Sequence, residues 1–323
     1  MILTSGEAVE TLRAAGEPTR LRILALLARE ELSVLELCTV LDQSQPRVSR
    51  HLKLLSEAGL VERFPDGAWV FYRLAAHGAR RALADEVLAL VDPDDAALRR
   101  DAERFRRVEA ERSAEAAAYF ARNAARWDEI RSLYVAEAQV EDAIGEVVGA
   151  DPVGLLVDLG AGTGRMLTLL GGRARRSVGL DLSQQMLNIA RVNVGEAGLA
   201  ACELRHGDIF ATGLPAGCAD LVTVHQVLHY LGDPAAAVAE AARLVAPGGR
   251  LLIVDFAPHA LEQLREQHQH RRLGFSDEEI GRWLAAGGLG VESARALPPA
   301  GGRGLTVRIW TARRPALAER SAA

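Results

Sequence analysis

Three alternating glycines stand between an apolar segment and the start of a helical pattern. Residues 157–164 read Val-Asp-Leu-Gly-Ala-Gly-Thr-Gly, which places Gly160, Gly162 and Gly164 in one loop. Glycine lets the backbone turn tightly and lets a ligand approach the main chain, and a helix start offers free N–H donors. The pattern predicts a nucleotide-cofactor site. Arg165 stands where a dinucleotide loop has its third glycine, so the spacing favours a smaller ligand.

Two acidic residues follow at the ends of the next apolar segments. Asp181 ends the run 177–182, and a carboxylate at that position can accept both hydroxyl groups of a ribose. Asp208, in His-Gly-Asp-Ile at 206–209, ends a further candidate strand. The alternative is a glycine turn without a ligand, in which Asp158, Asp181 and Asp208 are solvated acids at the ends of three strands.

Four ordered elements resemble the class I S-adenosylmethionine-dependent methyltransferases over roughly residues 115–312. They are the loop 158–164, Asp181, the segment 207–209, and Leu-Val-Ala-Pro-Gly-Gly-Arg-Leu at 244–251. The resemblance implies that the loop binds near the methionine part of the cofactor, that Asp181 holds its ribose, and that Asp208 with Ile209 contacts its adenine. S-adenosylhomocysteine is the implied product or effector. The expected cofactor-binding residues are Asp158, Gly160, Ala161, Gly162, Gly164, Asp181, Leu182, Asp208, Ile209 and His225.

Apolar runs alternate with helical patterns from Asp151 onward, which is typical of a parallel sheet with crossover helices. The expected strands are 153–159, 177–182, 202–208, 220–225, 250–256, 290–296 and 305–311. The last two, joined by the Pro- and Gly-rich segment 298–304, should form a hairpin at the sheet edge. The resemblance implies a Rossmann-like α/β fold with a seven-stranded sheet, whose ligands lie at the carboxyl ends of the strands.

The segment 224–231, Val-His-Gln-Val-Leu-His-Tyr-Leu, follows the fourth strand, where many relatives place acceptor-side or catalytic residues. His225 and His229 are therefore candidate general bases. Each is equally well interpreted as a satisfied polar residue at a helix start. The segment 268–275 adds two histidines and two arginines, which could form a lid, bind an anion or simply be solvated. The chain lacks the Asn/Asp-Pro-Pro-Tyr loop and the Pro-Cys nucleophile of DNA-methylating enzymes, so a small molecule is the expected methyl acceptor.

The first 75 residues are organised differently. Helical spacing of apolar residues covers 12–27, Ser33 is a candidate N-cap for a helix through Leu41, and a third helix covers 45–58. Candidate strands 60–63 and 69–74 flank the turn signal Asp66-Gly67. Three helices followed by a hairpin predict a winged helix-turn-helix, an α+β fold.

The third helix has an apolar face and a basic, hydrogen-bonding face. Together with Glu-Pro-Thr-Arg-Leu-Arg-Ile-Leu at 17–24 and Ala-Gly-Leu-Val at 58–61, it resembles the ArsR family of bacterial repressors over about residues 7–75. The resemblance implies an operator in double-stranded DNA. Arginines on such a helix suit base edges, whereas Lys53 and Arg63 suit phosphates. The expected DNA-contacting residues are Gln45, Arg47, Ser49, Arg50, Lys53 and Arg63. The alternative is a degenerate fold used only for dimerisation.

No metal site is expected. Thiolate sites of ArsR repressors use a Cys-x-Cys pair on the helix before the recognition helix, whereas this chain has Cys38 followed by Val40. Cys38 is thus interpreted as a packed thiol. The three cysteines are widely spaced and odd in number, which argues against a disulfide framework.

The chain has 323 residues, a length that allows two domains with hydrophobic cores. Its composition, 49% hydrophobic and 25% charged residues, is typical of globular proteins. The net charge of −5 argues against nucleic-acid binding by the whole surface but permits one basic helix face. The absence of a signal core or membrane-length apolar run predicts a cytoplasmic protein with no membrane partner. The expected divisions are a DNA-binding domain 1–91, a helical linker and lid 92–149, a methyltransferase domain 150–314 and a tail 315–323.

Tyr119, Phe120 and Trp127 punctuate an Ala-, Glu- and Arg-rich helical segment. They could cover the cofactor pocket, form a dimer surface or pack in the core, and their helical spacing favours the core. The chain is expected to form a homodimer. Two functions are compatible with its sequence. It is a DNA-binding regulator that methylates a small molecule, or a non-catalytic repressor that senses S-adenosylmethionine or S-adenosylhomocysteine.

Overall fold

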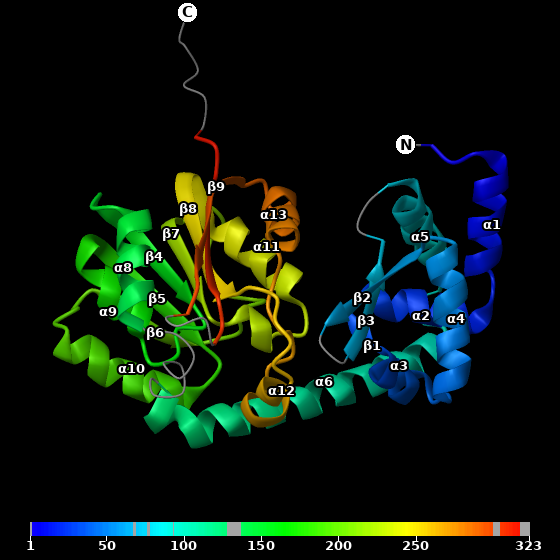
Figure 1. The fold of residues 1–323 in the computed structure, drawn as a ribbon, viewed down its shortest axis with the longest axis horizontal. Helices are drawn as coiled ribbons and strands as arrows, with labels where there is room; N and C mark the ends of the chain where they lie inside the picture. Colours follow the sequence, from blue (N-terminus) through cyan, green and yellow to red (C-terminus); the bar gives the residue numbers. More distant parts are fainter. Residues whose placement is uncertain are drawn as a thin grey trace, which may run out of the picture. The chain divides into compact units, whose positions relative to one another are not determined.

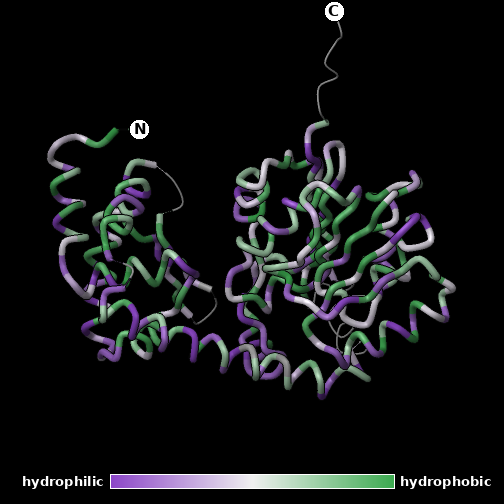
Figure 2. Tube along the Cα trace, turned by 180° about the vertical axis from the view of Figure 1, so that it is seen from behind, coloured by the Kyte–Doolittle hydropathy of each residue, from purple (hydrophilic) through white to green (hydrophobic). Residues whose placement is uncertain are grey.

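The computed structural model describes residues 2–66, 69–75, 78–92, 94–127, 137–299 and 304–316. The chain divides into two compact units, residues 1–115 (unit 1) and 116–323 (unit 2). The division falls inside helix α6 (Ala96–Asn123), so the segment expected to join the domains contributes to both units. Hydrophilic residues recur along this helix (Figure 2). Among the described residues, no helix is long and apolar enough to cross a membrane.

Unit 1 is a winged helix-turn-helix (Figure 1), as the sequence predicts. Its three-stranded antiparallel sheet has the order β1-β3-β2, and its hydrophobic core joins the helices to this sheet. The helices besides α6 are α1 (Ser5–Ala15), α2 (Pro18–Leu27), α3 (Val34–Leu41), α4 (Gln45–Glu57) and α5 (Ala79–Ala89). The strands are β1 (Leu32–Ser33), β2 (Val61–Asp66) and β3 (Trp69–Leu74). The expected hairpin pairing is confirmed, while Gly67 of its turn lies outside the described residues.

The single helix expected over 12–27 is wrong, because two helices occupy this region. Gly16 ends α1, and α2 begins at Pro18 with the Glu17 carboxylate accepting the Arg20 N–H. Proline has no N–H to donate and is tolerated in the first turn of a helix but not in its interior. The apolar periodicity continues across the break and conceals it.

The helix pair α3–α4 begins with a full capping box. The Ser33 hydroxyl accepts from the Glu36 N–H, and the Glu36 carboxylate accepts from the Ser33 N–H, which confirms Ser33 as the N-cap. Asp42 ends α3 in the left-handed region with φ 56°. On α4, the residues expected to face inward are fully buried: Val48, Leu52 and Leu55.

Unit 2 is an α/β fold around a seven-stranded sheet with the order β6-β5-β4-β7-β8-β10-β9. The strands are β4 (Val153–Leu159), β5 (Ala174–Asp181), β6 (Cys202–His206), β7 (Ala219–His225), β8 (Val245–Phe256), β9 (Gly290–Leu297) and β10 (Val307–Arg313). The first five run parallel, and β10 pairs antiparallel with β8 and β9. The predicted strand set and the hairpin at the sheet edge are therefore confirmed.

Helices cover both faces of this sheet (Figure 1). One hydrophobic cluster includes residues of α11 (Pro234–Leu244) and α13 (Asp277–Ala286), and another includes residues of α8 (Glu137–Val148) and α9 (Arg165–Leu170). The other helical elements of the described residues are α10 (Gln184–Glu196), α12 (Gln263–His268) and the 3-10 turns η1 (Ala124–Arg126), η2 (Gly171–Arg173) and η3 (Leu228–Tyr230). This layering leaves the carboxyl ends of the parallel strands to carry a site.

Candidate cofactor site and nucleic-acid interface

The glycine loop joins β4 to α9 and needs glycine for its backbone conformation. Gly160, Gly162 and Gly164 have φ values of 72°, 52° and 84°, in the left-handed region that L side chains rarely adopt. A Cβ at Gly160 would lie 2.5 Å from Cγ2 of Val227, and one at Gly164 would lie 3.2 Å from the Cβ of Ala190. The loop therefore packs tightly between the segment after β7 and helix α10.

Asp181 ties the end of β5 to this loop. Its Oδ2 accepts the N–H of Gly162 at 2.7 Å, and its Oδ1 accepts the N–H of Ser183 at 2.7 Å. Desolvation raises the pKa of Asp181 above its ordinary value, although both backbone donors favour the charged form. The acid and the loop, separated by 19 residues in sequence, thus meet at the carboxyl ends of neighbouring strands.

The open side of Gly162 provides a direct test of fit for a cofactor. Among the described residues, the only atom within 4 Å of a Cβ built at Gly162 would be Nε1 of Trp127, at 3.8 Å. A side chain at position 162 would thus fill a space beside the Trp127 indole. The loop, this space and the Asp181 carboxylate fit the cofactor that the motifs predict.

The other residues expected at the cofactor differ in exposure. Asp158 is buried on β4 and accepts the hydroxyl of Thr223 at 2.6 Å, so its carboxylate supports the strands beneath the loop. Ala161 and Ile209 are buried, while Leu182 is exposed beside Asp181. Asp208 is exposed and accepts the N–H of Phe210 at 2.9 Å; the preceding residue, Gly207, donates its N–H to the backbone carbonyl of Asp181 at 3.1 Å.

His229 lies in the turn after β7 and is held by an acid at the end of β8. Its Nδ1 is 2.7 Å from Oδ1 of Asp255, and the two side chains are 2% and 0% exposed. A buried carboxylate next to Nδ1 favours the tautomer with the proton on Nδ1 and the lone pair on Nε2. This is the arrangement of an oriented base. His225, the other expected base, is half-buried at the end of β7.

Aromatic side chains gather around His229. The site aromatic cluster consists of Tyr119, Phe120, Trp127 and Tyr230: the ring centroids of Phe120 and Tyr230 lie 4.9 Å apart, and those of His229 and Tyr230 lie 4.1 Å apart. The Tyr119 hydroxyl is 2.7 Å from Nδ1 of His268. These aromatics pack together, as their spacing favours, and they also border the site.

The sequence does not identify Asp255 or His270 as catalytic or cofactor-binding residues. The ring centroids of His270 and His229 lie 4.1 Å apart, and His270 is 7% exposed. Asp255 carries the signal that identifies Asp181, namely an acid near the end of an apolar strand, here 251–256. His270 lies in the segment 268–275, for which the sequence allows a lid, an anion site or a solvated loop. Its burial argues against the solvated loop.

The α4 face of unit 1 is exposed as expected. Its apolar residues enter the core, whereas the side chains left outside are polar or basic. The exposed candidates are Gln45, Arg47, Ser49, Arg50 and Lys53 on α4, with Arg63 on β2. Lys53 lies 3.8 Å from Glu57 one turn further along, a distance that leaves its charge available to solvent.

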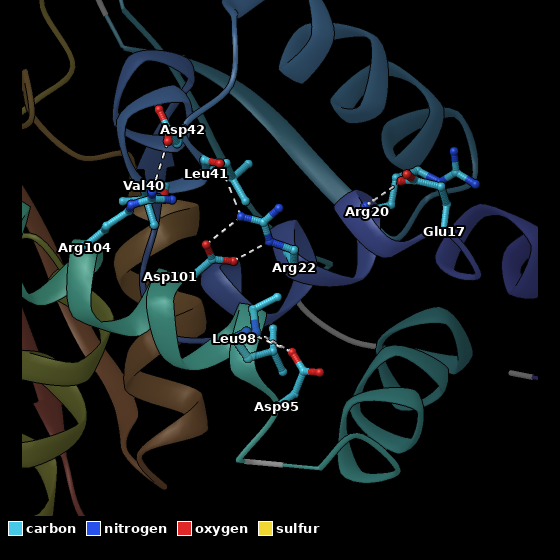
Figure 3. Close-up of polar contacts among 11 residues, drawn as sticks. Glu17, Arg20, Arg22, Val40, Leu41, Asp42, Asp95, Leu98, Asp101 and Arg104 are labelled. Atoms are coloured by element: carbon cyan, nitrogen blue, oxygen red, sulfur yellow. Dashed lines mark hydrogen bonds and ion pairs between the residues drawn. The ribbon is translucent and has the colours of Figure 1, made fainter.

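Side chains of α6 hold the turn between α3 and α4 (Figure 3). Arg22 makes a bidentate pair with Asp101, at 2.5 and 2.6 Å, and also donates to the Leu41 carbonyl at 3.2 Å. Arg104 donates to the Asp42 carboxylate at 3.0 Å. The helix-turn-helix is therefore fastened by residues about 60 to 80 positions later in the chain.

Cys38 is half-buried in the unit 1 core, and its burial raises the pKa of its thiol. Within the described ranges, no group of three His, Cys, Asp or Glu side chains is placed to hold a metal ion.

Two segments of the chain match known protein families. Residues 17–63 match the model described as bacterial regulatory protein, arsR family, and residues 157–253 match the methyltransferase domain. The arsenical resistance operon repressor of Escherichia coli is 49% identical over 70 residues, 21% of this chain and 60% of the repressor. A helix-turn-helix transcriptional regulator of Methanocaldococcus jannaschii is 37% identical over 87 residues, 27% of this chain and 92% of the regulator.

Unit 2 has its own relatives. The ubiquinone biosynthesis O-methyltransferase of Thiobacillus denitrificans is 37% identical over 95 residues, 29% of this chain and 40% of the enzyme. A Haloferax volcanii methyltransferase solved in complex with the Trm112 activator has a TM-score of 0.51 and 20% identity, covering 61% of this chain and 97% of that one, which shows the fold. The chain thus spans 60% and 40% of the repressor and the O-methyltransferase that it matches.

The chain belongs to the ArsR family of helix-turn-helix regulators through unit 1. Unit 2 is a class I methyltransferase domain, and S-adenosylmethionine is its cofactor.

Proposed function

We propose that this protein is a DNA-binding transcriptional regulator that also transfers a methyl group from S-adenosylmethionine to a small molecule. The observation that carries the enzymatic part is the buried His229–Asp255 pair, at 2.7 Å, in the same unit as the glycine loop. The exposed basic face of α4 in an ArsR-family domain supports the regulatory part. A protein that binds an operator acts in the cytoplasm. It would bind as a symmetric homodimer to a pseudo-palindromic operator.

The cofactor would be held by the loop and the strand-end acids. Asp181 would accept hydrogen bonds from the ribose hydroxyls, Gly162 leaves room beside Trp127, and Asp208 with Ile209 would border the adenine. When bound, S-adenosylmethionine supplies an electrophilic methyl group on a sulfonium sulfur. The protein contributes alignment of the acceptor with that carbon, which accounts for a large share of such a rate enhancement.

His229 is the proposed general base. Its Nε2 would take the proton of the acceptor hydroxyl whose oxygen receives the methyl group. Asp255 fixes the ring and stabilises the imidazolium that results. The resemblance to an O-methyltransferase and the aromatic side chains around His229 support a planar hydroxylated acceptor.

The experiment uses S-adenosylmethionine labelled at the methyl group. The purified protein is incubated with this cofactor and a protein-free small-molecule extract of the source cells, and transfer of the label to an organic compound is followed. We expect label transfer. Tight cofactor binding without label transfer would instead favour the second candidate, a sensing repressor, which the long helix α6 shared by both units supports.

Asp181→Ala should weaken S-adenosylhomocysteine binding about 10- to 100-fold, because hydrogen bonds to a charged group contribute about 1.5 to 3 kcal/mol. Isothermal titration calorimetry measures this affinity. Glu196→Ala, which removes an exposed acid at the end of α10, is the matched control and should bind like the wild type. Retained affinity in Asp181→Ala would contradict the ribose assignment.

Arg50→Ala should reduce operator affinity by about 1 to 3 kcal/mol and relax the preference for one base, if its guanidinium reads a base edge. Lys53→Ala is the comparison variant. It should weaken binding to operator and scrambled DNA alike and reduce the salt dependence, because a phosphate contact carries no sequence information. Gel-shift titrations at several salt concentrations separate the two effects, and an unchanged Arg50→Ala titration would remove its role.

A further inference from the structure

The first part of α6 is built into the DNA-binding unit. Phe105 is 5% exposed within the hydrophobic core of unit 1, and Asp101 is 2% exposed in its bidentate pair with Arg22. Loss of α6 would leave the mostly buried Arg22 guanidinium of α2 without this carboxylate partner, so the pair requires α6 to be in place. The winged helix-turn-helix therefore does not end with α5, because its core includes α6.

Two arginines of α6 contact α3 at its opposite ends. Arg112 donates to Glu36 at 2.8 Å and to Glu30 at 2.7 Å, and Glu36 is the capping-box residue in the first turn of α3. Arg104 donates to Asp42, the residue that ends α3 and begins the turn into α4 (Figure 3). Helix α6 thus fixes α3 and the turn that positions the recognition helix α4.

The last part of α6 belongs to the methyltransferase unit. Tyr119 and Phe120 are members of the site aromatic cluster, and the Tyr119 hydroxyl is 2.7 Å from His268. Arg112, the last residue of α6 with a described ion pair to α3, precedes Tyr119 by 7 residues, about two helical turns. One helix therefore carries contacts to α3 and contacts near His229.

Between these two sets of contacts, the described part of the helix buries few side chains. Most described side chains from 109 to 118 are exposed, and their sequence is rich in Ala, Glu and Arg. Helix formation is cooperative, so a stretch of this kind is stabilised when the turns at its ends are fixed. Fixing Tyr119 would stabilise the turn that carries Arg112.

We propose that α6 transmits occupancy of the cofactor site to the recognition helix. The proposal rests on the function proposed above and specifies how its two sites are coupled. A ligand that fixes the site aromatic cluster stabilises the helix through 109–118, strengthens the Arg112 and Arg104 contacts, and preorganises α3 and α4 for DNA. S-adenosylhomocysteine therefore tightens operator binding.

The test breaks the helix without touching either site. Ala110, Ala114 and Ala118 are exposed on α6. Replacing all three by glycine lowers the helix propensity of this stretch, while replacing all three by glutamine keeps it close to that of alanine. The full chain with either set of substitutions is titrated onto a fragment of its own promoter, with and without saturating S-adenosylhomocysteine. Calorimetry measures ligand affinity separately.

We expect S-adenosylhomocysteine to tighten promoter binding at least threefold in the wild type and in the triple-glutamine protein, and to have no effect in the triple-glycine protein. Hydrogen exchange of the backbone amides in 106–118 should slow on ligand binding in the wild type. Equal responses in all three proteins, no response in the wild type, or weaker promoter binding with ligand would overturn the proposal. Failure of the wild type to bind either ligand or promoter would refute the proposed function itself.

Discussion

Replacing His229 by asparagine should lower the rate of methyl transfer by about 100- to 10,000-fold, the range that a positioned general base contributes. Asparagine keeps an N–H donor toward Asp255, so the buried carboxylate retains a partner, but it has no basic nitrogen. The affinity for S-adenosylhomocysteine should change little, because the proposed cofactor contacts, the glycine loop and Asp181, follow or end β4 and β5, whereas His229 follows β7. The rate is measured as label transferred from S-adenosylmethionine, and calorimetry measures the affinity.

Two further variants distinguish catalysis from packing. Asp255→Asn should leave a weaker enzyme rather than an inactive one, because the imidazole loses its orienting charge but keeps Nε2. His225→Asn, which changes the half-buried histidine at the end of β7, should transfer methyl groups at close to the wild-type rate, because we assign the base to His229 in its buried pair with Asp255. A large loss in His225→Asn together with near-normal transfer by His229→Asn would reverse our assignment of the base.

Asp101→Ala should lower the free energy of unfolding of unit 1 by about 3 kcal/mol, because removing one partner of a buried ion pair leaves the other charge without compensation. Arg22 is 20% exposed and Asp101 only 2%, so little solvent reaches the pair. Native-state hydrogen exchange of the α4 amides measures this free energy within unit 1, where whole-chain unfolding would mix the two units.

The control is Asp94→Ala, in which the lost carboxylate is 82% exposed and 3.8 Å from Arg99. A surface pair of this kind contributes about 0 to 1 kcal/mol, so exchange at α4 should be nearly unchanged. Equal exchange in Asp101→Ala and Asp94→Ala would show that α6 does not stabilise the DNA-binding unit, and would remove the basis of the coupling through this helix.

Local sequence signals predict most of the fold. Ser33 is followed three positions later by Glu36, and this spacing alone identifies the start of α3. Apolar runs ending in Gly or Asp identify the parallel strands and their carboxyl ends, and thus the loop and Asp181. The break at Gly16 and Pro18 is missed because apolar spacing continues through it, although proline near a helix start is itself a signal.

Long-range pairs are beyond the reach of such signals. The partners Arg22 and Asp101 are separated by 79 residues, and His229 and Asp255 by 26. Each side chain alone is an ordinary charged or polar residue in a helix, a turn or a strand. Only the folded arrangement shows that these pairs are buried, so the sequence identifies His229 as one of two candidates and gives no role to Asp101.

The most direct test of the account is a titration of the full chain onto a labelled fragment of its own promoter at one fixed salt concentration, with no ligand, with S-adenosylmethionine and with S-adenosylhomocysteine. We predict tighter binding to this fragment than to a scrambled one, and a further gain in affinity with S-adenosylhomocysteine. The contrary result is equal affinity for the promoter fragment and the scrambled fragment, with no change on adding either ligand. It would contradict our central claim that the protein is a regulator whose methyltransferase domain affects its DNA binding.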